Sequence, residues 1–533
     1  MRLLLTVGAL CTGGAGSLSG CAYGDGCYDE RTCLSPPESL CDGDPATAMA
    51  LDACGVFVSE QGDDSSPGTK GAPVRTLQHA IGLAAHVRGN GQAPTRRVYA
   101  CGGVFEEAIS LPQGVDLWGG RQCAGGDWSY GGPLDDQNAS TVIAPPVGIP
   151  VRIVGGDDAV TAVDDATSVI FGVRAVAADA SASDGKSSIA MILEHGARAI
   201  VQSSVILAGD GKEGEPGEDA PSFRANAGVV GNNGADACTA DMAPGALPVV
   251  TVCGDGIEST GGQGGDGGLQ AGRDGASGLP EPAGSPPDLG LGGSGAVGMD
   301  CEDGGRGAVG TDAERADGAV GAGLLGLDGW VGVRGKDGGK GGVGQGGGGG
   351  GGGKGRDPTR NACPTDRPQA GAAGGSGGSG GCGGKGGQGG GYGGASIAVV
   401  ALQGSDLTVK ASTVLGAKGG DGGVGGTGQW GGFGVAGGKG GRGSVTDTSP
   451  GCDGGFGGDG GRGGDAGGGL GGHSLGIGSV GASVAILEDA TVSPGQAGTG
   501  GMGANATLES GLGKGNDGTT LFWYRFDAPA PEP

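Results

Sequence analysis

The residue types best suited to acid–base or metal chemistry in this chain are two pairs of adjacent carboxylates, Asp157-Asp158 and Asp164-Asp165. They lie seven residues apart, in a stretch that we expect to form strands. Carboxylates gathered on one face of a sheet can bind Ca²⁺ or act as general acid and base. Neighbouring strand residues point to opposite faces, so each pair places only one carboxylate on a given face. We favour solvated turn carboxylates over a site and predict no catalytic residue.

Other patterns typical of catalytic or cofactor-binding sites are missing or uninformative. Only four histidines occur and no two cysteines have CxxC spacing, so we expect no zinc site. Strings like GxGxxG arise from composition, GGDGG-type strings lack the apolar residue of Ca²⁺-binding repeats, and GxSxG and P-loop motifs are missing. His79 and His86 are predicted on a helix surface, while His195 and His473 are isolated. We predict no metal and no cofactor; the enzyme question stays open, with a non-enzymatic role favoured.

The N-terminus has the pattern of an export signal, with Arg2, an apolar stretch from Leu3 to Leu10 and then small residues. This stretch is too short to span a bilayer. The sequence LSGC that ends at Cys21 resembles the lipobox of bacterial lipoproteins, which implies an acylated Cys21 and a membrane-anchored, extracytoplasmic protein. Ala22 favours, by the same resemblance, the outer membrane or cell surface. The alternatives are a plain secretory signal and a chance match.

Cysteine numbers agree with export. Cys11 leaves with the signal and Cys21 takes the lipid, so 14 − 2 = 12 cysteines remain, an even number that suits disulfides in an oxidising compartment. We expect pairing within local loops, for example Cys101 with Cys123 and Cys238 with Cys253, although spacing alone does not fix the connectivity. The remaining cysteines are Cys27, Cys33, Cys41, Cys54, Cys101, Cys123, Cys238, Cys253, Cys301, Cys363, Cys382 and Cys452.

Charge and composition restrict the partners and the fold class. The chain has 32 Lys and Arg against 58 Asp and Glu, a net charge of −26, so we expect no nucleic-acid partner and no attraction to anionic lipid. Its 139 glycines and 27 prolines, with aromatic residues at 4 %, exclude an ordinary compact globule over the whole length.

The elements that would position any site begin at residue 56. We predict a strand at 56–58, a helix with apolar residues at 77, 80, 81 and 84, and strands at 98–101, 104–111 and 115–120. This order resembles the N-terminal part of pectin-lyase-like right-handed parallel β-helices over about residues 56–120. The motifs that carry the likeness are FVSEQGDDSSPGTKGAPVRTLQHAI, VYACGGVFEEAISL and GVDLWGG. The resemblance implies an all-β fold, a right-handed parallel β-helix with an N-terminal capping helix.

Three later blocks, residues 188–207, 396–415 and 474–493, align without gaps at their serines. Apolar residues coincide, for example at Ile189/Ile397/Leu475 and at Val201/Val409/Leu487. Such repetition predicts successive coils of one stack. Segments within 141–178 have the pattern of further coils, and the aromatic sequence TTLFWYRF could close the C-terminal end.

The tracts between these blocks are rich in glycine. Every third residue is Gly over 335–353, 374–389 and 416–443, which is the period of polyproline II, and the lack of Pro in 416–443 disfavours collagen. Two alternatives remain: flexible coil, which is usual for Gly-rich linkers and which we favour, or polyglycine-II-like helices packed side by side and pinned by Cys363, Cys382 and Cys452. The tracts resemble PGRS repeats of bacterial surface proteins in GGX density only.

These observations predict a modular chain in which glycine-rich insertions interrupt one β-helix. The expected parts are the lipoprotein signal peptide 1–20, a Cys-rich tether 21–54, the start of the β-helix with its cap 55–132, rungs 133–207, a glycine-rich insertion 208–395, a rung 396–415, a second glycine-rich insertion 416–473, and the last rungs with the C-terminal strand 474–533.

We therefore expect a non-enzymatic cell-surface lipoprotein with a structural or adhesive role. Its partners would be a membrane, through the lipid anchor, and extracellular glycans or proteins. The alternative is a polysaccharide-binding or polysaccharide-degrading β-helix protein, because several pectin-lyase-like proteins are lyases or hydrolases; Asp157, Asp158, Asp164 and Asp165 would then be its candidate residues.

Overall fold

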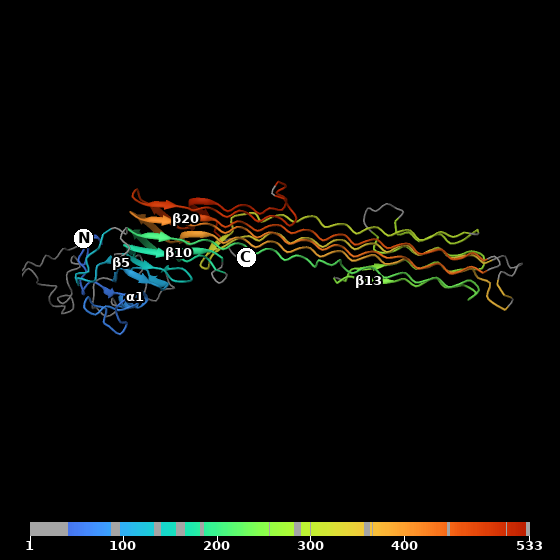
Figure 1. The fold of residues 1–533 in the computed structure, drawn as a ribbon, viewed down its shortest axis with the longest axis horizontal. Coiled ribbons are helices and arrows are strands. Elements are labelled where there is room, and N and C mark those ends of the chain that lie inside the picture. The colour runs from blue at the N-terminus through green and yellow to red at the C-terminus, as the bar shows by residue number, and fades with distance from the viewer. Residues whose placement is uncertain are drawn as a thin grey trace, which may run out of the picture.

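Three parallel β-sheets form one end of the molecule, and extended glycine-rich segments run out from them as a long rod (Figure 1). The computed structural model describes residues 41–86, 96–132, 140–155, 166–181, 186–254, 256–281, 289–298, 300–355, 363–364, 366–444, 448–507 and 509–528. The all-β class is confirmed over these residues, since α1 (Leu77–His86) is the one helix that they contain.

All three large sheets are parallel, and the chain visits them in turn. Consecutive strands such as β10, β11 and β12 belong to three different sheets, and the next strands of each sheet lie further along the stack. The first sheet contains β1 (Val56–Val58), β2 (Arg97–Cys101), β5 (Asp116–Arg121), β8 (Ser168–Phe171), β11 (Arg198–Gln202), β18 (Asp406–Lys410) and β21 (Ser483–Ile486). The second contains β4 (Ile109–Pro112), β7 (Val151–Val154), β10 (Ser188–Leu193), β17 (Ser396–Ala401), β20 (Ser474–Val480) and β23 (Thr520–Phe526). The third contains β3 (Gly103–Phe105), β6 (Thr141–Ile143), β9 (Val173–Val176), β12 (Val205–Leu207), β19 (Thr413–Leu415) and β22 (Thr491–Ser493).

The three repeated blocks stack on one another as predicted. Ser188 pairs with Ser396, and Ser396 with Ser474, at the start of the block. The ungapped alignment is wrong in the middle strand, because Val409 pairs with Ile486 and not with Leu487. Between the paired positions Ala401/Ser479 and Asp406/Ser483, the third block has one residue fewer than the second, and the following turn restores the register at β22.

The sheets enclose an apolar core between them. Alternating residues of the strands, such as Leu111, Leu117, Ile153 and Val201, are fully buried there. Three strands of the second sheet are buried on both faces, since every residue of β10, β17 and β20 is buried. Their outer face packs against Trp330 of the hairpin β15 (Leu324–Gly326) and β16 (Gly329–Val331), where the rod begins.

Helix α1 covers the first strands with its apolar face. The predicted residues Leu77, Ala80, Ile81 and Ala84 are buried, and His79 and His86 are exposed as expected. The carboxylate of Glu107 accepts the N–H groups of Leu77 and Gln78 at 2.6 and 3.1 Å, which satisfies the free donors at the helix N-terminus.

The single strand predicted for 104–111 is wrong. This segment forms β3 and β4, which belong to different sheets. Glu106 and Glu107 lie between them and carry no strand pairing. The chain turns at these residues, so that Glu107 reaches the helix.

The glycine-rich segments connect β12 with β17, β19 with β20, and β22 with β23. They run outward and back as extended segments that lie side by side along the rod (Figure 1). Two short antiparallel hairpins lie within their described residues, β13 (Val250–Val252) with β14 (Glu258–Thr260), and β15 with β16. We call these segments together the glycine-rich bundle.

Candidate functional site

The residues predicted to carry chemistry are not among those that the structure describes. Cys21 and the carboxylates Asp157, Asp158, Asp164 and Asp165 lie outside the described residues, so these sites remain predictions. Over the part of the chain that the structure describes, no three His, Cys, Asp or Glu side chains gather so that they could hold a metal ion. No helix within the same residues has the length and apolar character needed to cross a membrane.

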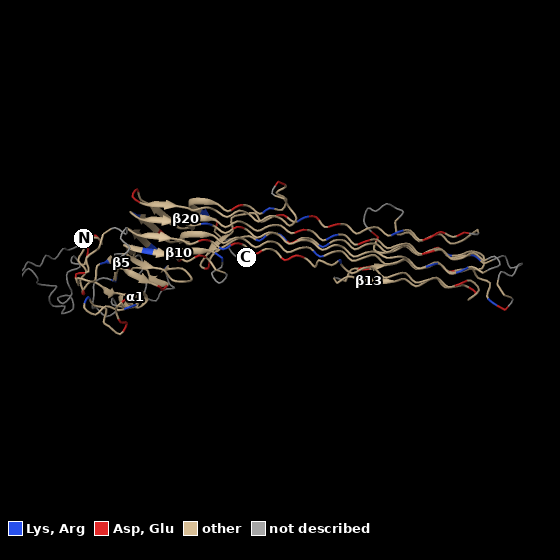
Figure 2. Ribbon diagram, viewed as in Figure 1, with Lys and Arg blue, Asp and Glu red and all other residues tan. Residues whose placement is uncertain are grey.

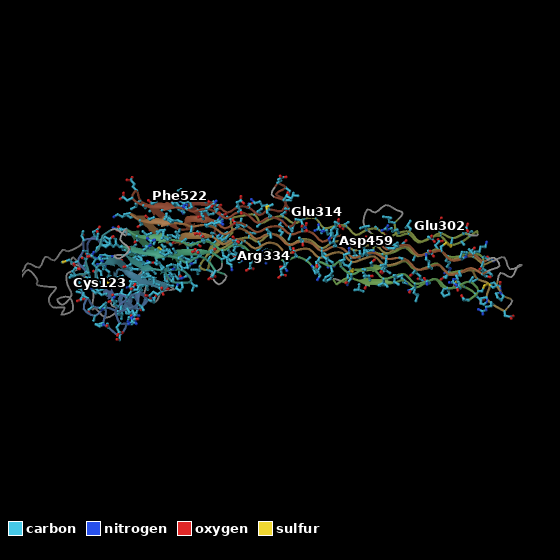
Figure 3. The ribbon with its side chains drawn as sticks, in the orientation of Figure 1. Cys123, Glu302, Glu314, Arg334, Asp459 and Phe522 are labelled. Atoms are coloured by element: carbon cyan, nitrogen blue, oxygen red, sulfur yellow. A yellow bond between two sulfur atoms is a disulfide. The ribbon has the colours of Figure 1, made fainter. Side chains whose placement is uncertain are left out.

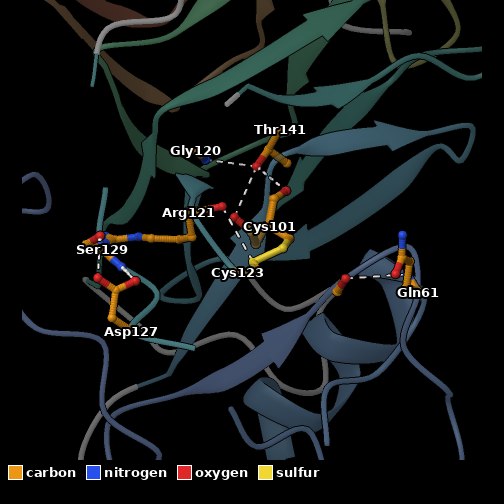
Figure 4. Close-up of a disulfide and its surroundings, with 10 residues drawn as sticks. Gln61, Cys101, Gly120, Arg121, Cys123, Asp127, Ser129 and Thr141 are labelled. Carbon is orange, nitrogen blue, oxygen red and sulfur yellow. Dashed lines mark hydrogen bonds between the residues drawn. A yellow bond between two sulfur atoms is a disulfide. The ribbon is translucent and has the colours of Figure 1, made fainter. Parts of the chain in front are cut away.

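A cavity of about 660 Å³ lies beside the Cys101–Cys123 disulfide, among the first strands (Figure 4). Its two carboxylates bind groups of the protein itself. Glu60 accepts the N–H of Val104, and Asp127 accepts the N–H and the hydroxyl of Ser129 at 3.3 and 3.0 Å. The hydrogen bonds from Ser129 hold the pKa of Asp127 below its ordinary value. Both carboxylates thus fix loops.

The buried Arg121 contributes to the wall of this cavity. Its guanidinium carbon lies 5.4 and 5.5 Å from the ring centres of Tyr99 and Trp118, and Nη2 donates to the Pro45 carbonyl oxygen at 2.7 Å. Burial lowers the pKa of Arg121 to about 10, so the group stays charged at neutral pH. Among the described lining residues, no nucleophile is paired with a base, and the arrangement is that of a structural loop cluster.

Five disulfides join described cysteines, which indicates an oxidising, extracytoplasmic compartment. The predicted Cys101–Cys123 pair is confirmed. The predicted Cys238–Cys253 pair is wrong, because these cysteines bond to Cys363 and Cys382, 125 and 129 residues away. The expectation that cysteines pair within local loops is wrong in the bundle, because segments distant in the sequence lie side by side there. Cys301–Cys452 is a third bridge of this kind, so Cys363, Cys382 and Cys452 pin adjacent segments as expected, and Cys41–Cys54 joins residues near the first strands.

Backbone hydrogen bonds join the segments of the bundle, and their direction repeats every three residues. Residues 374 and 377 donate to segment 262–265, residues 375 and 378 to segment 452–455, and residues 376 and 379 to segment 229–232, at 2.8 to 3.0 Å. A flexible coil, the alternative favoured from the sequence, would not make these bonds. The three-residue period of glycine in the sequence is therefore also the period of the contacts.

A run of eight glycines, 346–353, lies at the centre of the bundle. Its N–H groups donate to three segments, which contain residues 273–279, 302–305 and 372–378. Its carbonyl oxygens accept from three others, which contain residues 262–268, 293–296 and 452–455. A Cβ at Gly349 would lie 1.9 Å from the carbonyl oxygen of Gln263, so no side chain fits. The uninterrupted glycine run therefore marks the segment that neighbours surround on all sides, a signal that the three-residue period alone does not give.

Outer segments of the bundle point every third side chain to solvent, and many of these side chains are charged (Figure 2). A set of acidic or amide side chains makes one repeated contact, in which Oδ1 accepts a backbone N–H of the neighbouring segment at 2.6 to 3.0 Å. These residues, which we call the aspartate bridges, are Asp179, Asp210, Asp219, Asn233, Asp236, Asp266, Asp274, Asp303, Asp312, Asp337, Asp421, Asp453, Asp459, Asp465 and Asp517. They supply acceptors to edge N–H groups that have no segment beyond them.

In some bridges the hydrogen bonds lower the pKa of the carboxylate. Hydrogen bonds from the Thr427 N–H and hydroxyl lower the pKa of Asp219. Burial raises the pKa of Asp465, but hydrogen bonds from Gly428 and Asn505 and the nearby Arg462 outweigh it, and its pKa is lowered. Only Asp157, Asp158, Asp164 and Asp165 were predicted to be solvated turn carboxylates. For the bridges, Asp in phase with the GGX triplets, as in GGDGG, was a readable signal.

His473 is not isolated, contrary to the sequence-based expectation. Its ring lies 4.9 Å from that of Trp330 and 5.7 Å from those of Tyr524 and Phe526. The Thr519 N–H donates to Nδ1 at 2.8 Å, so Nε2 carries the hydrogen that it donates to the Ala322 oxygen, also at 2.8 Å. Burial lowers the pKa of His473. The neutral ring fastens the second sheet to the hairpin β15–β16.

Charged side chains such as Glu302, Glu314, Arg334 and Asp459 lie along the rod (Figure 3). Phe522 of β23 is half exposed at the sheet end. Such surfaces bind through shape and charge. Comparison with known proteins gives no relative: no family model, no curated protein and no solved structure matches this chain.

Proposed function

We propose that this protein is a non-enzymatic, extracytoplasmic structural or adhesive protein anchored through an acylated Cys21. In this proposal the three parallel sheets form a right-handed parallel β-helix, and the glycine-rich segments are polyglycine-II-like helices. The strand order, which visits the sheets in turn, supports the first assignment. The three-residue period of the backbone bonds and the six neighbours of residues 346–353 support the second.

The observation that carries the proposal is the hydrogen-bonded rod. A flexible glycine-rich chain spans a distance that grows only with the square root of its length. A bundle whose segments bond in three directions, and which Cys238–Cys363, Cys253–Cys382 and Cys301–Cys452 pin, keeps its full length. A rod of fixed length is useful for holding a contact surface away from a membrane.

The direction of the rod fits an anchor at the N-terminus. Cys41 packs with Phe57 and Tyr99 at the sheet end, opposite the far end of the rod (Figure 1). A lipid at Cys21, only 20 residues before Cys41, would place the sheets near the membrane and point the bundle outward.

The second candidate is a polysaccharide-degrading enzyme. It depends on Asp157, Asp158, Asp164 and Asp165, which lie outside the described residues. The 660 Å³ cavity does not favour it, since Glu60 and Asp127 hold loops there. Release of unsaturated or reducing sugars from uronate polymers by the purified protein would select this alternative.

The test of the adhesive proposal uses cells that carry the full-length protein. We expect wild-type cells to display it to protease and to attach to a glycan-rich surface, and Cys21→Ser cells to lose both properties while the protein itself still folds. Attachment that is unchanged by Cys21→Ser, or purified protein that scatters X-rays as a flexible coil, would overturn the proposal.

A further inference from the structure

One outer segment of the bundle loses its three-residue period at Pro221–Phe223. The Ala220 N–H bonds to the Thr427 oxygen, and the next bond of this row runs from Ala225 to Trp430. Five residues of one segment (225 − 220) therefore match three of the other (430 − 427). The two additional residues form a bulge, and Phe223 at its tip is 72 % exposed.

A dedicated side chain supports this bulge. Position 429 has Gln between Gly428 and Trp430, where the GGX pattern has glycine, and its side chain is buried. Its Oε1 accepts the Lys385 N–H at 3.1 Å, and its Nε2 donates to the Phe223 oxygen at 2.9 Å. The amide thus replaces the backbone pairing that the bulge gives up. Bulges held in this way are built features and often lie beside functional sites.

Hollows flank the bulge on both sides. The first, of about 470 Å³, is lined by Phe223, Asn226, Lys340 and Lys385 among others, and no Asp or Glu is among its described lining residues. Lys385 is exposed here and contributes a positive group in a chain of net charge −26. Both hollows have the size of small-ligand sites, about 300 to 1,000 Å³.

The second hollow, of about 410 Å³, has a polar wall. Ser222, Thr427 and Asn505 contribute hydroxyl and amide groups, with Trp430 and Arg462 beside them. Asp219 also lines this hollow, but its Oδ1 already accepts the N–H and the hydroxyl of Thr427, and Arg462 forms an ion pair with Asp465 at 2.7 Å. Such a set of donors and acceptors matches a ligand that carries many hydroxyl groups.

Exposed aromatic rings lie between guanidinium groups next to the hollows. Trp430 and Phe433 are 56 % and 53 % exposed. The guanidinium carbon of Arg224 lies 4.1 Å from the ring centre of Phe433 and 5.6 Å from that of Trp430, and Arg462 lies 5.1 Å from Trp430. One N–H of Arg224 donates to the Gly431 oxygen, and a guanidinium has five donors, so donors remain for a ligand.

We propose that this bulge site binds an acidic glycan, a polysaccharide whose sugars carry carboxylates. Sugar rings pack their C–H faces on aromatic side chains and offer hydroxyl groups to amides, while carboxylates pair with Lys and Arg. A protein partner needs a continuous apolar centre, whereas here charged groups and hollows separate the rings. The inference rests on the proposed adhesive function and names the ligand class that the rod would hold.

The test titrates the full-length protein in detergent with oligogalacturonate, with neutral dextran and with polyglutamate, by calorimetry. We expect oligogalacturonate to bind, with an affinity that falls as salt rises, and dextran and polyglutamate to bind at least tenfold more weakly. Trp430→Ala should weaken oligogalacturonate binding about fivefold, since a stacked ring contributes on the order of 1 kcal/mol. Lys385→Gln should weaken it about threefold and reduce the salt dependence.

The matched control is Phe456→Ala, which removes a partly exposed ring beside Arg306 on a neighbouring segment and should leave binding unchanged. Lys385 is an exposed residue, so its variant tests the site even if Trp430→Ala disturbs the fold, which thermal unfolding would reveal. Equal binding of polyglutamate, or full affinity in both Trp430→Ala and Lys385→Gln, would overturn the inference. If the purified protein does not bind oligogalacturonate but wild-type cells still attach, the glycan site is wrong. The adhesive function would then remain.

Discussion

The sheets and the glycine-rich bundle reach order by opposite means. In the sheets, strands pair within three planes, and side chains such as Leu111, Leu117 and Val201 fill the space between the planes. In the centre of the bundle, residues 346–353 have no side chains and bond to neighbours in six directions. The first region is stabilised mainly by the burial of apolar area, and the second by a density of backbone hydrogen bonds that only close approach of glycines permits.

The two regions should therefore fail through different substitutions. A sheet core is weakened when a side chain becomes smaller, because a cavity remains. A glycine bundle is weakened when a side chain is added, because the segments are forced apart. The cost of ordering so many glycines is also high, which is consistent with three disulfides within the bundle.

The largest expected effect is that of Leu117→Ala in the sheets. Leu117 is fully buried in β5, and removal of its side chain should lower the free energy of unfolding by about 4 kcal/mol. Denaturant unfolding followed by tryptophan fluorescence measures it, since Trp118 adjoins the site. The control is Leu487→Ala at a partly exposed position, and an equal loss there would contradict a core stabilised by side-chain burial.

Two adjacent glycines sharpen the comparison in the bundle. A Cβ at Gly338 would lie 1.9 Å from the Gly464 oxygen, while a Cβ at Gly339 would meet only the Cβ of Ala313 at 3.4 Å. We expect Gly338→Ala to destabilise the bundle by about 3 kcal/mol and Gly339→Ala to have little effect. Calorimetric unfolding with limited proteolysis of the bundle measures this. Similar melting of the two variants would mean that the segments are not in close contact.

Sequence predicted the sheets better than the bundle, for a physical reason. Apolar residues recur at matching positions of β10, β17 and β20, and this common pattern predicted the pairing of the blocks. The one-residue shift at Val409 was not predicted. The chain is one residue shorter before β21 and one residue longer after it, so the patterns of β20 and β22 still align with those of β17 and β19. Helix α1 followed from its apolar period, but its cap by Glu107 depends on a contact 30 residues away.

Glycine residues do not indicate which segment packs beside them, because they have no side chain that could distinguish one neighbour from another. The partners of Cys238 and Cys253 lie 125 and 129 residues away and could not be chosen by spacing. The sequence does contain three other signals: aspartates that recur at the third position of GGX triplets, the glycine run 346–353, and a glutamine at position 429, where the triplet pattern has glycine. The candidate glycan site depends on that last departure and on the bulge opposite it, which only the structure shows.

A smaller effect is expected from the aspartate bridges, and it differs between buried and exposed members. Asp465 is 4 % exposed, accepts the Gly428 N–H and contacts Arg315, Arg462 and Asn505. Asp465→Ala should cost about 2 kcal/mol because it leaves buried donors unpaired. The exposed Asp312→Ala, which removes one bond from the Arg462 N–H, should cost well below 1 kcal/mol. Equal stability of both variants in thermal unfolding would show that the bridges do not stabilise the bundle.

The smallest expected effect is a pH dependence of stability at His473, which lies where the second sheet meets the hairpin β15–β16. The bundle should not share this dependence. Burial lowers the pKa of His473 below the ordinary 6.5, so the unfolded chain binds a proton more readily than the folded one. The contribution of His473 is complete above about pH 6.5 and is lost as the pH falls from there through the lower pKa of the folded state, with a slope of at most about 1.4 kcal/mol per pH unit. The aspartate bridges whose pKa values are lowered from 3.8, such as Asp219 and Asp465, stay ionised in this window and weaken only below about pH 4. Mild acid should therefore loosen the junction before the bundle. Hydrogen exchange of the Thr519 amide, which donates to Nδ1, would report the loosening, and His473→Gln should abolish the dependence between pH 6.5 and 4.5. If exchange in the bundle rises first, or if His473→Gln keeps the same pH dependence, then His473 does not couple the sheets to the rod.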